Sequence, residues 1–486
     1  MSQNDVACRS DRIHPRLSVL TESQIEWIHT VSLDILASVG VRVDSEKARR
    51  VLARGIGATA VDGDRVRIPP EIVSWAIEAA PASVALYDRL GQPAFTLGPG
   101  QDQTRFGIGV TTLFYQDPLT DELTPFARSH MAALVRLGDH LPHYDVISTV
   151  GVVQDVPPED SDLYGTLDMV ANTTKPLVLL VSEEKRFPLV LDMLESLTGD
   201  LAAQPFVIPY FNPVTPLIIN AGTSDKMFAA IERGLPFIYS NYGMAGMSTP
   251  ITPGGAWALL NAELLAGLVL SQLIREGTPV ILGILPAYFD MKTMVNFYDP
   301  YSLLLNLACA ELMAHYGLPH CGTSGSGRGW GPDLLAAEAY WMNHLSSCMG
   351  KVGLSPFVGD TLTSKAFSPV NVVFVHEIIA QTRRFVQGFL LDEAASCLKE
   401  IAAVGPGGNF LTAPSTLRSY RNAYYTSSIY PRWSMEMWQK DGCPRAEAVL
   451  REHTLQLLEE SAAPPDQADL VARGEAFIRR TTQSTP

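Results

Sequence analysis

A glycine-rich loop holds the first residues that could bind a small molecule. It runs from Gly322 to Asp333, reads GTSGSGRGWGPD, and places five glycines around one arginine and one tryptophan. Glycine costs backbone entropy on folding, and close approach of the backbone to a ligand is one reason for a protein to bear that cost. Arg328 could pair with a carboxylate, and the ring of Trp330 could hold a cation. Three flanking glycines would let these side chains reach inward: Gly327, Gly329 and Gly331.

Aromatic and polar side chains also follow several apolar runs of the sequence. The aromatic candidates for a cation-binding cage are Tyr239, Tyr242, Tyr288 and Phe357, with Phe297, Tyr298 and Tyr301 on a nearby loop. Candidate polar anchors are Asn212 and Asn241, and candidate carboxylates that complement a cation are Asp290 and Asp360. Core packing is the more common role of any single aromatic residue. The set as a whole favours a methylated ammonium, because each aromatic face contributes about 0.5 to 2 kcal/mol to binding such a cation.

The sequence supports acid–base catalysis and metal binding less well than it supports the binding of a cation. Asp290 and Asp360 are the only evident pair for glycoside hydrolysis, and each is also placed to cap a helix. The serines of GTSGSG lack a partner histidine, and His376 lies within a helical pattern, where a structural role is favoured. The sequence contains no CxxC, HExxH or HxH motif, and Cys321 beside His320 is interpreted as structural. We therefore expect catalysis without an acid–base pair and without a metal bound by this chain.

The overall charge argues against nucleic-acid binding. The 486 residues carry a formal net charge of −15 and form no basic stripe. Six cysteines are scattered without a framework spacing, and residues 1–18 lack an apolar core, so we expect free thiols and a cytoplasmic location. The longest apolar run is interrupted by Asn261, Glu263 and Gln272, which predicts a buried helix rather than a membrane span.

From about residue 100 the sequence alternates between short apolar runs and helical stretches, in eight successive pairs. Such alternation indicates a parallel sheet covered by helices, and eight units favour a closed TIM (β/α)8 barrel over an open sheet. We predict an α/β fold with an N-terminal α+β lead-in (1–100), the barrel (101–395) and a C-terminal loop-rich and helical extension (396–486). The aromatic tail of that extension could pack within the chain or against a second subunit of a homo-oligomer; it contains Tyr424, Tyr425, Tyr430 and Trp433.

Four long stretches closely resemble the trimethylamine methyltransferase family. They are FNPVTPL, GMAGMSTPITPGGAWALLNAELLAGLVLSQLI, YGLPHCGTSGSGRGWGPDLLAAE and VGPGGNFLTAPSTLRSYR. The resemblance covers about residues 20–465. It implies a TIM barrel that transfers a methyl group from an amine to the cobalt of a separate corrinoid protein. Archaeal trimethylamine members carry pyrrolysine in the segment that matches GSGRGWGPD, whereas this chain has ordinary residues there, with Gly329 or Trp330 at the matching place. A second departure is Ser415, where the family pattern leads us to expect histidine.

The chain thus resembles the branch without pyrrolysine, whose members include glycine betaine methyltransferases. That resemblance implies methyl transfer from a quaternary amine, such as glycine betaine, to the Co(I) corrinoid of a partner protein. The chain lacks a DxHxxG cobalamin signature, so we expect it to bind no cofactor tightly and the partner to supply methylcobalamin or another corrinoid. The alternatives are demethylation of another onium compound (carnitine, proline betaine or a sulfonium), a betaine-binding barrel without chemistry, and an unrelated barrel hydrolase.

Overall fold

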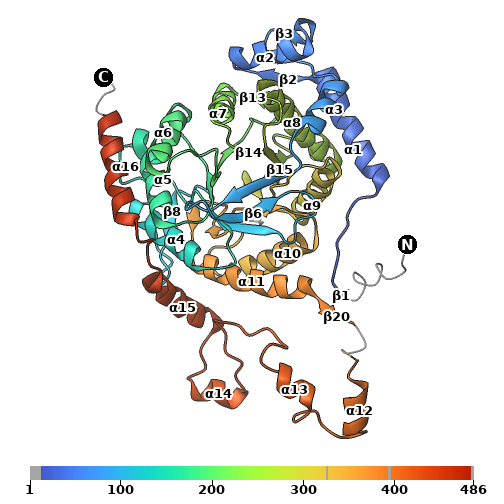
Figure 1. Cartoon of the computed structure of the whole chain (residues 1–486), viewed down its shortest axis with the longest axis vertical. Coiled ribbons are helices and arrows are strands. Elements are labelled where there is room, and N and C mark those ends of the chain that lie inside the picture. The colour runs from blue at the N-terminus through green and yellow to red at the C-terminus, as the bar shows by residue number, and fades with distance from the viewer. Residues whose placement is uncertain (1–11, 324–326, 392–395, 483–486) are drawn as a thin grey trace.

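A strongly curled eight-stranded sheet forms the centre of this α/β protein, with helices outside it (Figure 1). The structure, a computed structural model, describes residues 12–323, 327–391 and 396–482. In their order of pairing the strands are β16 (Val295–Phe297), β15 (Val280–Asp290), β14 (Phe237–Ala245), β12 (Val207–Phe211), β11 (Leu177–Leu179), β10 (Val146–Ser148), β7 (Arg105–Ile108) and β17 (Leu354–Ser355). All of these pairs are parallel except β15 with β16, which is an antiparallel hairpin.

The two flanks of the curled sheet are linked by a short extended segment. Leu282 of β15 forms a parallel bridge with His320, and the next residue, Cys321, forms one with Leu354 of β17. The segment at residues 320–321 therefore lies between β15 and β17, where the sequence predicts a strand.

A helix follows each parallel strand and the segment at residues 320–321, in agreement with the predicted alternation. These helices are α4 (Arg128–His140), α5 (Ser161–Asn172), α6 (Phe187–Thr198), α7 (Ala221–Glu232), α8 (Pro253–Ile274), α9 (Pro300–His315), α10 (Leu334–Met349) and α11 (Pro369–Gln387). Local chemistry sets two of the starts: Asp299 and Asp333 are N-caps whose carboxylates accept backbone N–H groups of α9 and α10. A small sheet lies between the helices, built from β8 (Phe114–Gln116), β9 (Leu123–Pro125), β18 (Asp360–Thr361) and β19 (Ala366–Phe367).

A hairpin closes the amino-terminal ends of the strands. It consists of β5 (Val84–Tyr87) and β6 (Pro93–Leu97) and lies over the centre of the ring in Figure 1. Its backbone N–H groups reach residues just before two strands, Tyr87 N to Pro205 O (3.0 Å) and Arg89 N to Thr174 O (2.8 Å). The apolar side chains of the hairpin join the core inside the curled sheet, where Leu86 and Leu97 are buried.

The N-terminal helices pack on the outside of α8 rather than over a mouth of the sheet. They are α1 (Glu22–Asp34), α2 (Glu46–Ile56) and α3 (Pro70–Ala79), and they accompany a sheet of β2 (Val41–Val43), β3 (Val61–Asp62), β4 (Arg65–Val66) and β13 (Ile218–Ile219). Helix α8 is long and apolar enough to cross a membrane by length and composition, but 83% of its most apolar window is buried inside the molecule. Its apolar surface is explained by the neighbours that enclose it.

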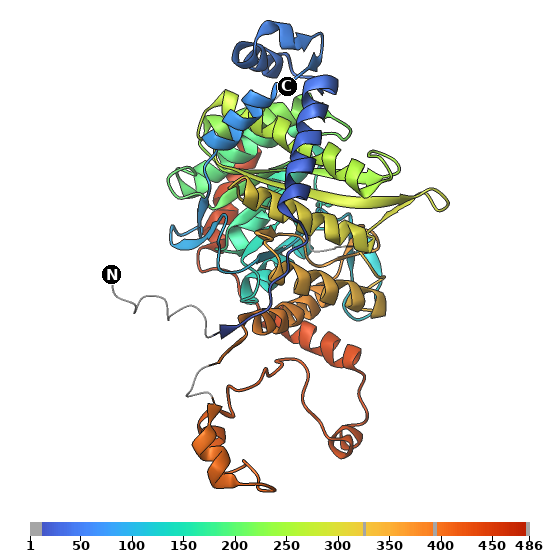
Figure 2. The ribbon, with the colours of Figure 1, turned by 90° about the vertical axis from the view of Figure 1, so that its right-hand side faces the viewer.

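The C-terminal region has a packed part and a projecting part (Figure 2). Helices α15 (Ala446–Glu460) and α16 (Gln467–Thr482) lie against α4, α5, α6 and α11. Before them come α12 (Leu398–Val404), α13 (Pro414–Ser419) and α14 (Met435–Lys440), which stand away from the body. A two-stranded ribbon of β1 (Arg12–Ile13) and β20 (Phe389–Leu390) precedes this projecting part.

Candidate functional site at the carboxyl ends of the strands

A pocket of about 500 Å³ lies beyond the carboxyl ends of the strands. Three segments line it: residues 295–300 between β15 and α9, residues 327–330 before α10, and residues 362–363 after β18. The first segment comprises β16 and the turn into α9, and the other two lie on the connections from residues 320–321 to α10 and from β17 to α11. Ligands of parallel α/β folds bind in crevices at this end, because the connecting loops there vary without disturbing the sheet.

Backbone hydrogen bonds fix the glycine-rich loop against its neighbour. The carbonyl of Gly327 accepts from Thr363 N (2.8 Å), and that of Gly329 accepts from Leu362 N (3.0 Å). The carbonyl of Trp330 accepts from Gln116 Nε2 (2.8 Å). The loop therefore presents its side chains from a defined backbone.

Two of the three predicted glycines are required by the backbone itself. Gly327 has φ +83° and Gly329 has φ +88°, in the left-handed region that favours glycine. A Cβ on Gly329 would also lie 2.7 Å from Asp333 Oδ1 and 2.8 Å from Ala336 Cβ. Gly331 has ordinary space, since a Cβ there would lie 3.4 Å from the Gln116 side chain.

Aromatic side chains from two loops line the pocket. Trp330 lies on one side and is 72% exposed; Phe297 and Tyr298 lie on the other. Tyr288 and Tyr242 stand behind this wall: the Tyr288 ring packs on that of Phe297 (centroids 6.1 Å apart), and the Tyr242 hydroxyl accepts from Asn296 Nδ2 (2.7 Å). Burial raises the pKa of both tyrosines, so both hydroxyls are neutral.

Charged side chains of both signs meet at the pocket. Arg328 lies in its wall, with Nη2 3.5 Å from Glu338 Oε2 in a largely exposed ion pair. Asp299 also lines the pocket, while its Oδ1 accepts from Tyr301 N (2.8 Å). Sequence reasoning missed Asp299 as a site residue, although the Asp-Pro pair before an apolar stretch is a helix-start signal that locates it.

A smaller adjoining cavity extends the site between α9 and α10. It shares Tyr298, Asp299 and Arg328 with the main pocket and reaches Asn343. Asn343 is buried, and neither its amide oxygen nor its nitrogen has a hydrogen-bond partner within the described chain. Sequence reasoning missed this residue too, because a single asparagine in an apolar helix gives no signal of the direction it faces.

Tyr239 and Asn241 face away from the pocket, toward α8. The Tyr239 ring fills the space that a Cβ on Gly267 would occupy. Asn241 donates from Nδ2 to Leu260 O (2.8 Å) and to Glu263 Oε2 (2.7 Å). Both residues attach β14 to its outer helix, and neither lines the pocket.

Asn212, Phe357 and Asp360 are absent from the pocket wall; Asn212 is half-buried, and the other two are buried. Asn212 donates from Nδ2 to Ser240 O (2.7 Å), and the Phe357 ring packs edge-on against Tyr210. Asp360 is fully buried in β18.

Asp290 stands at the tip of the β15–β16 hairpin, where it accepts from Lys292 N (2.9 Å) and Thr293 Oγ1 (2.8 Å). Asp290 thus caps the turn of its own hairpin, whereas Asp360 is buried in β18.

The remaining candidates have structural surroundings. His376 lies beside His143, and burial lowers its pKa to about 3, so its imidazole is neutral. Burial likewise lowers the pKa of His320 to about 3, and the described residues contain no group of three or more His, Cys, Asp or Glu that could hold a metal ion. Cys309, Cys321, Cys348 and Cys443 are not in disulfide bonds. Ser415 bonds Glu400 in the projecting C-terminal part. Ser324 and Ser326, the serines of GTSGSG, lie outside the described residues.

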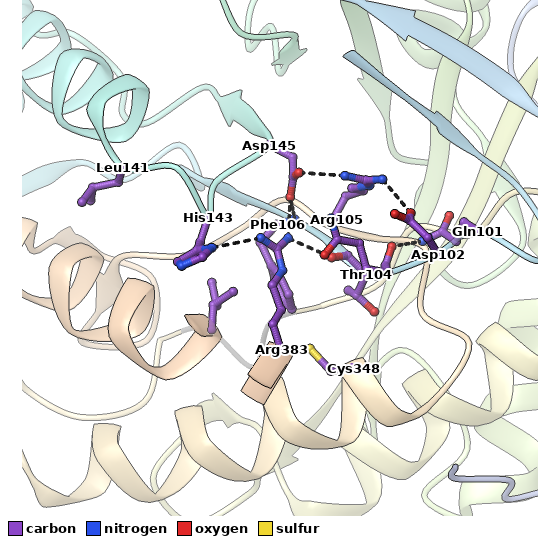
Figure 3. A network of polar contacts seen from close by, with 12 residues as sticks. Gln101, Asp102, Thr104, Arg105, Phe106, Leu141, His143, Asp145, Cys348 and Arg383 are labelled. Carbon is purple, nitrogen blue, oxygen red and sulfur yellow. Dashed lines mark hydrogen bonds and ion pairs between the residues drawn. The ribbon is translucent and has the colours of Figure 1, made fainter. Parts of the chain in front are cut away.

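A second polar cluster lies at the opposite, amino-terminal ends of the strands (Figure 3). Asp145, just before β10, accepts from Arg383 Nη2 (2.8 Å), Arg105 Nη1 (3.2 Å) and Phe106 N (3.0 Å). Arg383 also donates to Thr104 O (3.1 Å). These contacts tie α11 to the first two strands, so we assign the cluster to stability.

The pocket combines aromatic walls, one arginine and two nearby carboxylates, and it lies at the strand ends of an α/β fold, where enzymes of this architecture bind small molecules. The model of a protein family described as trimethylamine methyltransferase (MTTB) matches residues 2–486, and the chain belongs to that family. This confirms the resemblance carried by the four sequence motifs, and the chain is an enzyme of the methyltransferase class.

Relatives extend over nearly the whole chain. It is 26% identical to a glycine betaine methyltransferase of Desulfitobacterium hafniense (strain Y51), over 96% of this chain and 97% of that protein. It is 24% identical to the trimethylamine methyltransferase MttB of Desulfitobacterium hafniense (strain DSM 10664 / DCB-2), over 96% and 94% respectively. The crystal structure of the Methanosarcina barkeri monomethylamine methyltransferase (MtmB) aligns with a TM-score of 0.46 at 9% identity, over 91% of this chain and 94% of that one.

Proposed function

We propose that this methyltransferase removes a methyl group from a quaternary amine of the glycine betaine type and passes it to the corrinoid of a partner protein. The observation that carries the proposal is the composition of the pocket. Trp330, Phe297 and Tyr298 offer aromatic faces to a quaternary ammonium. Asp299 adds a negative charge beside it, and Arg328 lies in the same wall to pair with a carboxylate.

The chemistry asks little of the protein beyond binding and orientation. When a quaternary ammonium loses a methyl group, nitrogen keeps the electron pair of the broken N–CH₃ bond and leaves as a neutral tertiary amine. That leaving group needs no proton, so the step requires no general acid. The pocket residues therefore act by desolvating the cation and by aiming one methyl outward along the line of attack.

The corrinoid, when its partner protein is bound, supplies the nucleophilic cobalt that accepts the methyl group. The surroundings of the pocket fit a protein that covers it. Apolar side chains stand exposed on the β15–β16 hairpin and where the chain enters α9 and α10, and two of them, Val295 and Trp330, line the pocket: Met291, Met294, Val295, Tyr301, Trp330 and Leu334. Exposed apolar patches of this kind mark surfaces that bind other proteins.

We also propose that the curled sheet is a closed (β/α)8 barrel. The bridges from Leu282 to His320 and from Cys321 to Leu354 support a strand between β15 and β17. With that strand, eight parallel strands alternate with eight helices, and the pocket takes the end at which barrel enzymes bind substrates. We also propose that the barrel domain spans residues 101–395, between the N-terminal lead-in and the C-terminal extension.

An assay of methyl transfer tests the proposed function. The purified chain is incubated with deuterated glycine betaine and reduced Co(I) cobalamin, and the expected product, deuterated dimethylglycine, is measured by mass spectrometry. Carnitine, proline betaine, dimethylsulfoniopropionate and trimethylamine are tested in parallel. Turnover of another onium compound alone would show that this compound, rather than glycine betaine, is the substrate. Binding of betaine without any turnover, either with cobalamin or with a reduced corrinoid protein, would contradict the proposed enzymatic activity.

The role of Arg328 can be separated from that of the aromatic residues by ligand choice. We predict that Arg328→Ala weakens glycine betaine binding by about 10-fold or more, since a hydrogen bond to a charged group contributes about 1.5 to 3 kcal/mol. Binding of tetramethylammonium, which has no carboxylate, should be unchanged. Both dissociation constants are measured by calorimetry, and an equal loss for the two ligands would contradict a carboxylate clamp.

A further inference from the structure

The small cavity between α9 and α10 has a buried asparagine in its wall. Asn343 is 3% exposed, and within the described chain neither its Oδ1 nor its Nδ2 has a hydrogen-bond partner. Buried side-chain amides are nearly always hydrogen-bonded, because an unpaired polar group has lost its contacts with water and gained none in return. Since Asn343 lines a cavity, a molecule that enters this cavity can supply the missing bonds.

The volume of this cavity limits the group that it can hold. It is about 60 Å³, against about 500 Å³ for the main pocket. A water-sized group needs roughly 15 Å³ of such space, so the cavity holds about four of them. A carboxylate is smaller than this space, whereas a trimethylammonium group, whose methyls are each larger than a water, exceeds it. The small cavity therefore suits the carboxylate end of a betaine, and the main pocket suits the cationic end.

One cationic side chain reaches both spaces. Arg328 lines the small cavity together with Asn343 and also lines the main pocket. Its ion pair with Glu338 is long, with Nη2 3.5 Å from Oε2, and the two side chains are 37% and 66% exposed. An ion pair of this length and exposure is weak. Arg328 can therefore exchange Glu338 for the carboxylate of a ligand at little cost.

The acidic side chains at the small cavity have other places to act. Asp299 is the N-cap of α9, and its Oδ1 accepts from Tyr301 N (2.8 Å). It lines both spaces, so its charge also faces a cation in the main pocket. Glu338 is largely exposed to water. In addition, the positive end of α9 borders the small cavity at Ser302, which favours an anion there.

We propose that Asn343 determines specificity for zwitterionic substrates. Its Nδ2 donates to the carboxylate of the quaternary amine in the small cavity, and Arg328 pairs with the same carboxylate. The inference rests on the proposed function, because it assigns a place to one end of that substrate. The trimethylammonium group then lies in the main pocket beside Phe297 and Trp330. A substrate held at its carboxylate end presents a methyl group in a fixed direction.

Replacement of the amide by an apolar side chain of similar size tests the proposal. In Asn343→Leu the Kd for glycine betaine, measured by calorimetry, is expected to rise by about 10-fold or more, because a hydrogen bond to a charged group is lost. The Kd for tetramethylammonium, which has no carboxylate, should stay within about twofold of the native value. The control is Asn409→Leu, the same substitution at an exposed residue of the projecting C-terminal part, and it should change neither Kd.

Thermal unfolding separates a binding role from a structural one. The amide of Asn343 makes no hydrogen bond in the unliganded protein, so the Tm of Asn343→Leu should stay within a few degrees of the native value or rise above it. Asn343→Ala serves as a second variant, because it removes the amide without adding bulk to the cavity. It should show the same difference between glycine betaine and tetramethylammonium.

The outcomes distinguish this inference from the proposed function. Native affinity for glycine betaine in both Asn343 variants would show that only water fills the small cavity, and it would overturn the inference while the proposed function stands. A large fall in Tm together with an equal loss of both ligands would assign Asn343 to the fold, with the same consequence. A native chain that binds tetramethylammonium but not glycine betaine would overturn both.

Discussion

Trp330 combines a fixed backbone with a free ring. Its backbone N–H donates to Asp333 Oδ2 (2.8 Å), and its backbone carbonyl accepts from Gln116 Nε2 (2.8 Å). The residue as a whole is 72% exposed. Only the torsions of the side chain remain to be ordered when a ligand binds, which keeps the entropic cost of binding small. An exposed indole at a pocket edge is thus prepared to cover a cation.

Removing that ring should weaken the binding of a quaternary ammonium. Trp330→Ala is expected to raise the Kd for glycine betaine by about 2- to 30-fold, which corresponds to one cation–π contact of about 0.5 to 2 kcal/mol. Calorimetric titration measures it, and Trp330→Phe should restore most of the affinity. The exposed Trp27 on α1 supplies the control, since Trp27→Ala should leave Kd unchanged. An unchanged Kd in Trp330→Ala would remove this residue from the cage.

The residue scale also shows where sequence reasoning stops. The loop residues Arg328 and Trp330 could be placed at the pocket from sequence, because the glycines around them indicate an irregular backbone. Tyr239 and Tyr242 could not be told apart, although one faces α8 and the other faces the pocket wall. Strands buried on both faces carry apolar residues at every position, so the alternation that would reveal their inner side is missing.

At the scale of elements, the glycine-rich loop depends on one position more than on the others. We predict that Gly329→Ala displaces the loop and weakens betaine binding by at least about tenfold. The added Cβ would clash with Asp333 and Ala336, and alanine would have to adopt a strained, positive φ at this position. Gly63→Ala is a matched control: Gly63 has φ +63° but nothing within 4 Å of an added Cβ. Calorimetry on both variants isolates the steric contribution, and equal affinities would show that the loop tolerates a side chain.

A buried carboxyl group joins α8 to the loop before α7. Glu263 accepts from Leu217 N (2.6 Å), Thr215 Oγ1 (2.8 Å) and Asn241 Nδ2 (2.7 Å). Burial raises its pKa from 4.5 to about 7, and these donors only partly oppose the rise. The folded-state pKa lies above the unfolded-state value, so the contribution of Glu263 to stability is complete below about pH 4.5 and is lost as the pH rises through 7.

Glu263→Gln mimics the neutral acid and should remove this pH dependence. Between pH 5 and 7.5 the Tm of the native chain is expected to fall by a few degrees more than that of Glu263→Gln, which reflects a contribution on the order of 3 kcal/mol. Differential scanning calorimetry of both proteins across this range makes the comparison, and all other titrating groups cancel in the difference. Parallel curves would show that Glu263 has an ordinary pKa in the folded protein.

Elements were predicted unevenly for physical reasons. The eight helices after the strands have long periodic patterns with clear caps, such as Asp333 before α10, and these patterns are sufficient to predict the helices from sequence. The sequence predicts a loop where the structure has β16, because Val295–Phe297 is a short strand whose pairing with β15 depends on tertiary context. The short helices α12, α13 and α14 gave no signal, since helices of six or seven residues lack a full period.

At the scale of the whole molecule, stability and binding are assigned to opposite ends of the sheet. The β5–β6 hairpin and the Asp145 cluster close the amino-terminal ends, while the pocket and its loops occupy the carboxyl ends. Loops at the binding end can therefore change without loss of the core, as in barrel enzymes generally. Substitutions at the amino-terminal ends should therefore change stability, and substitutions at the carboxyl ends should change binding affinity.

Leu86 offers the sharpest test of that separation. It is buried between the hairpin and the inner core, so Leu86→Ala should destabilise the protein by about 2 to 5 kcal/mol through lost burial and a residual cavity. Its Kd for glycine betaine at 25 °C should remain within about twofold of the native value, because the pocket lies at the other end. Leu90→Ala, on the same hairpin but 61% exposed, should change neither quantity. Urea unfolding and calorimetric titration on the three proteins decide the matter: a parallel loss of stability and affinity in Leu86→Ala would mean that the hairpin shapes the pocket through the core of the sheet.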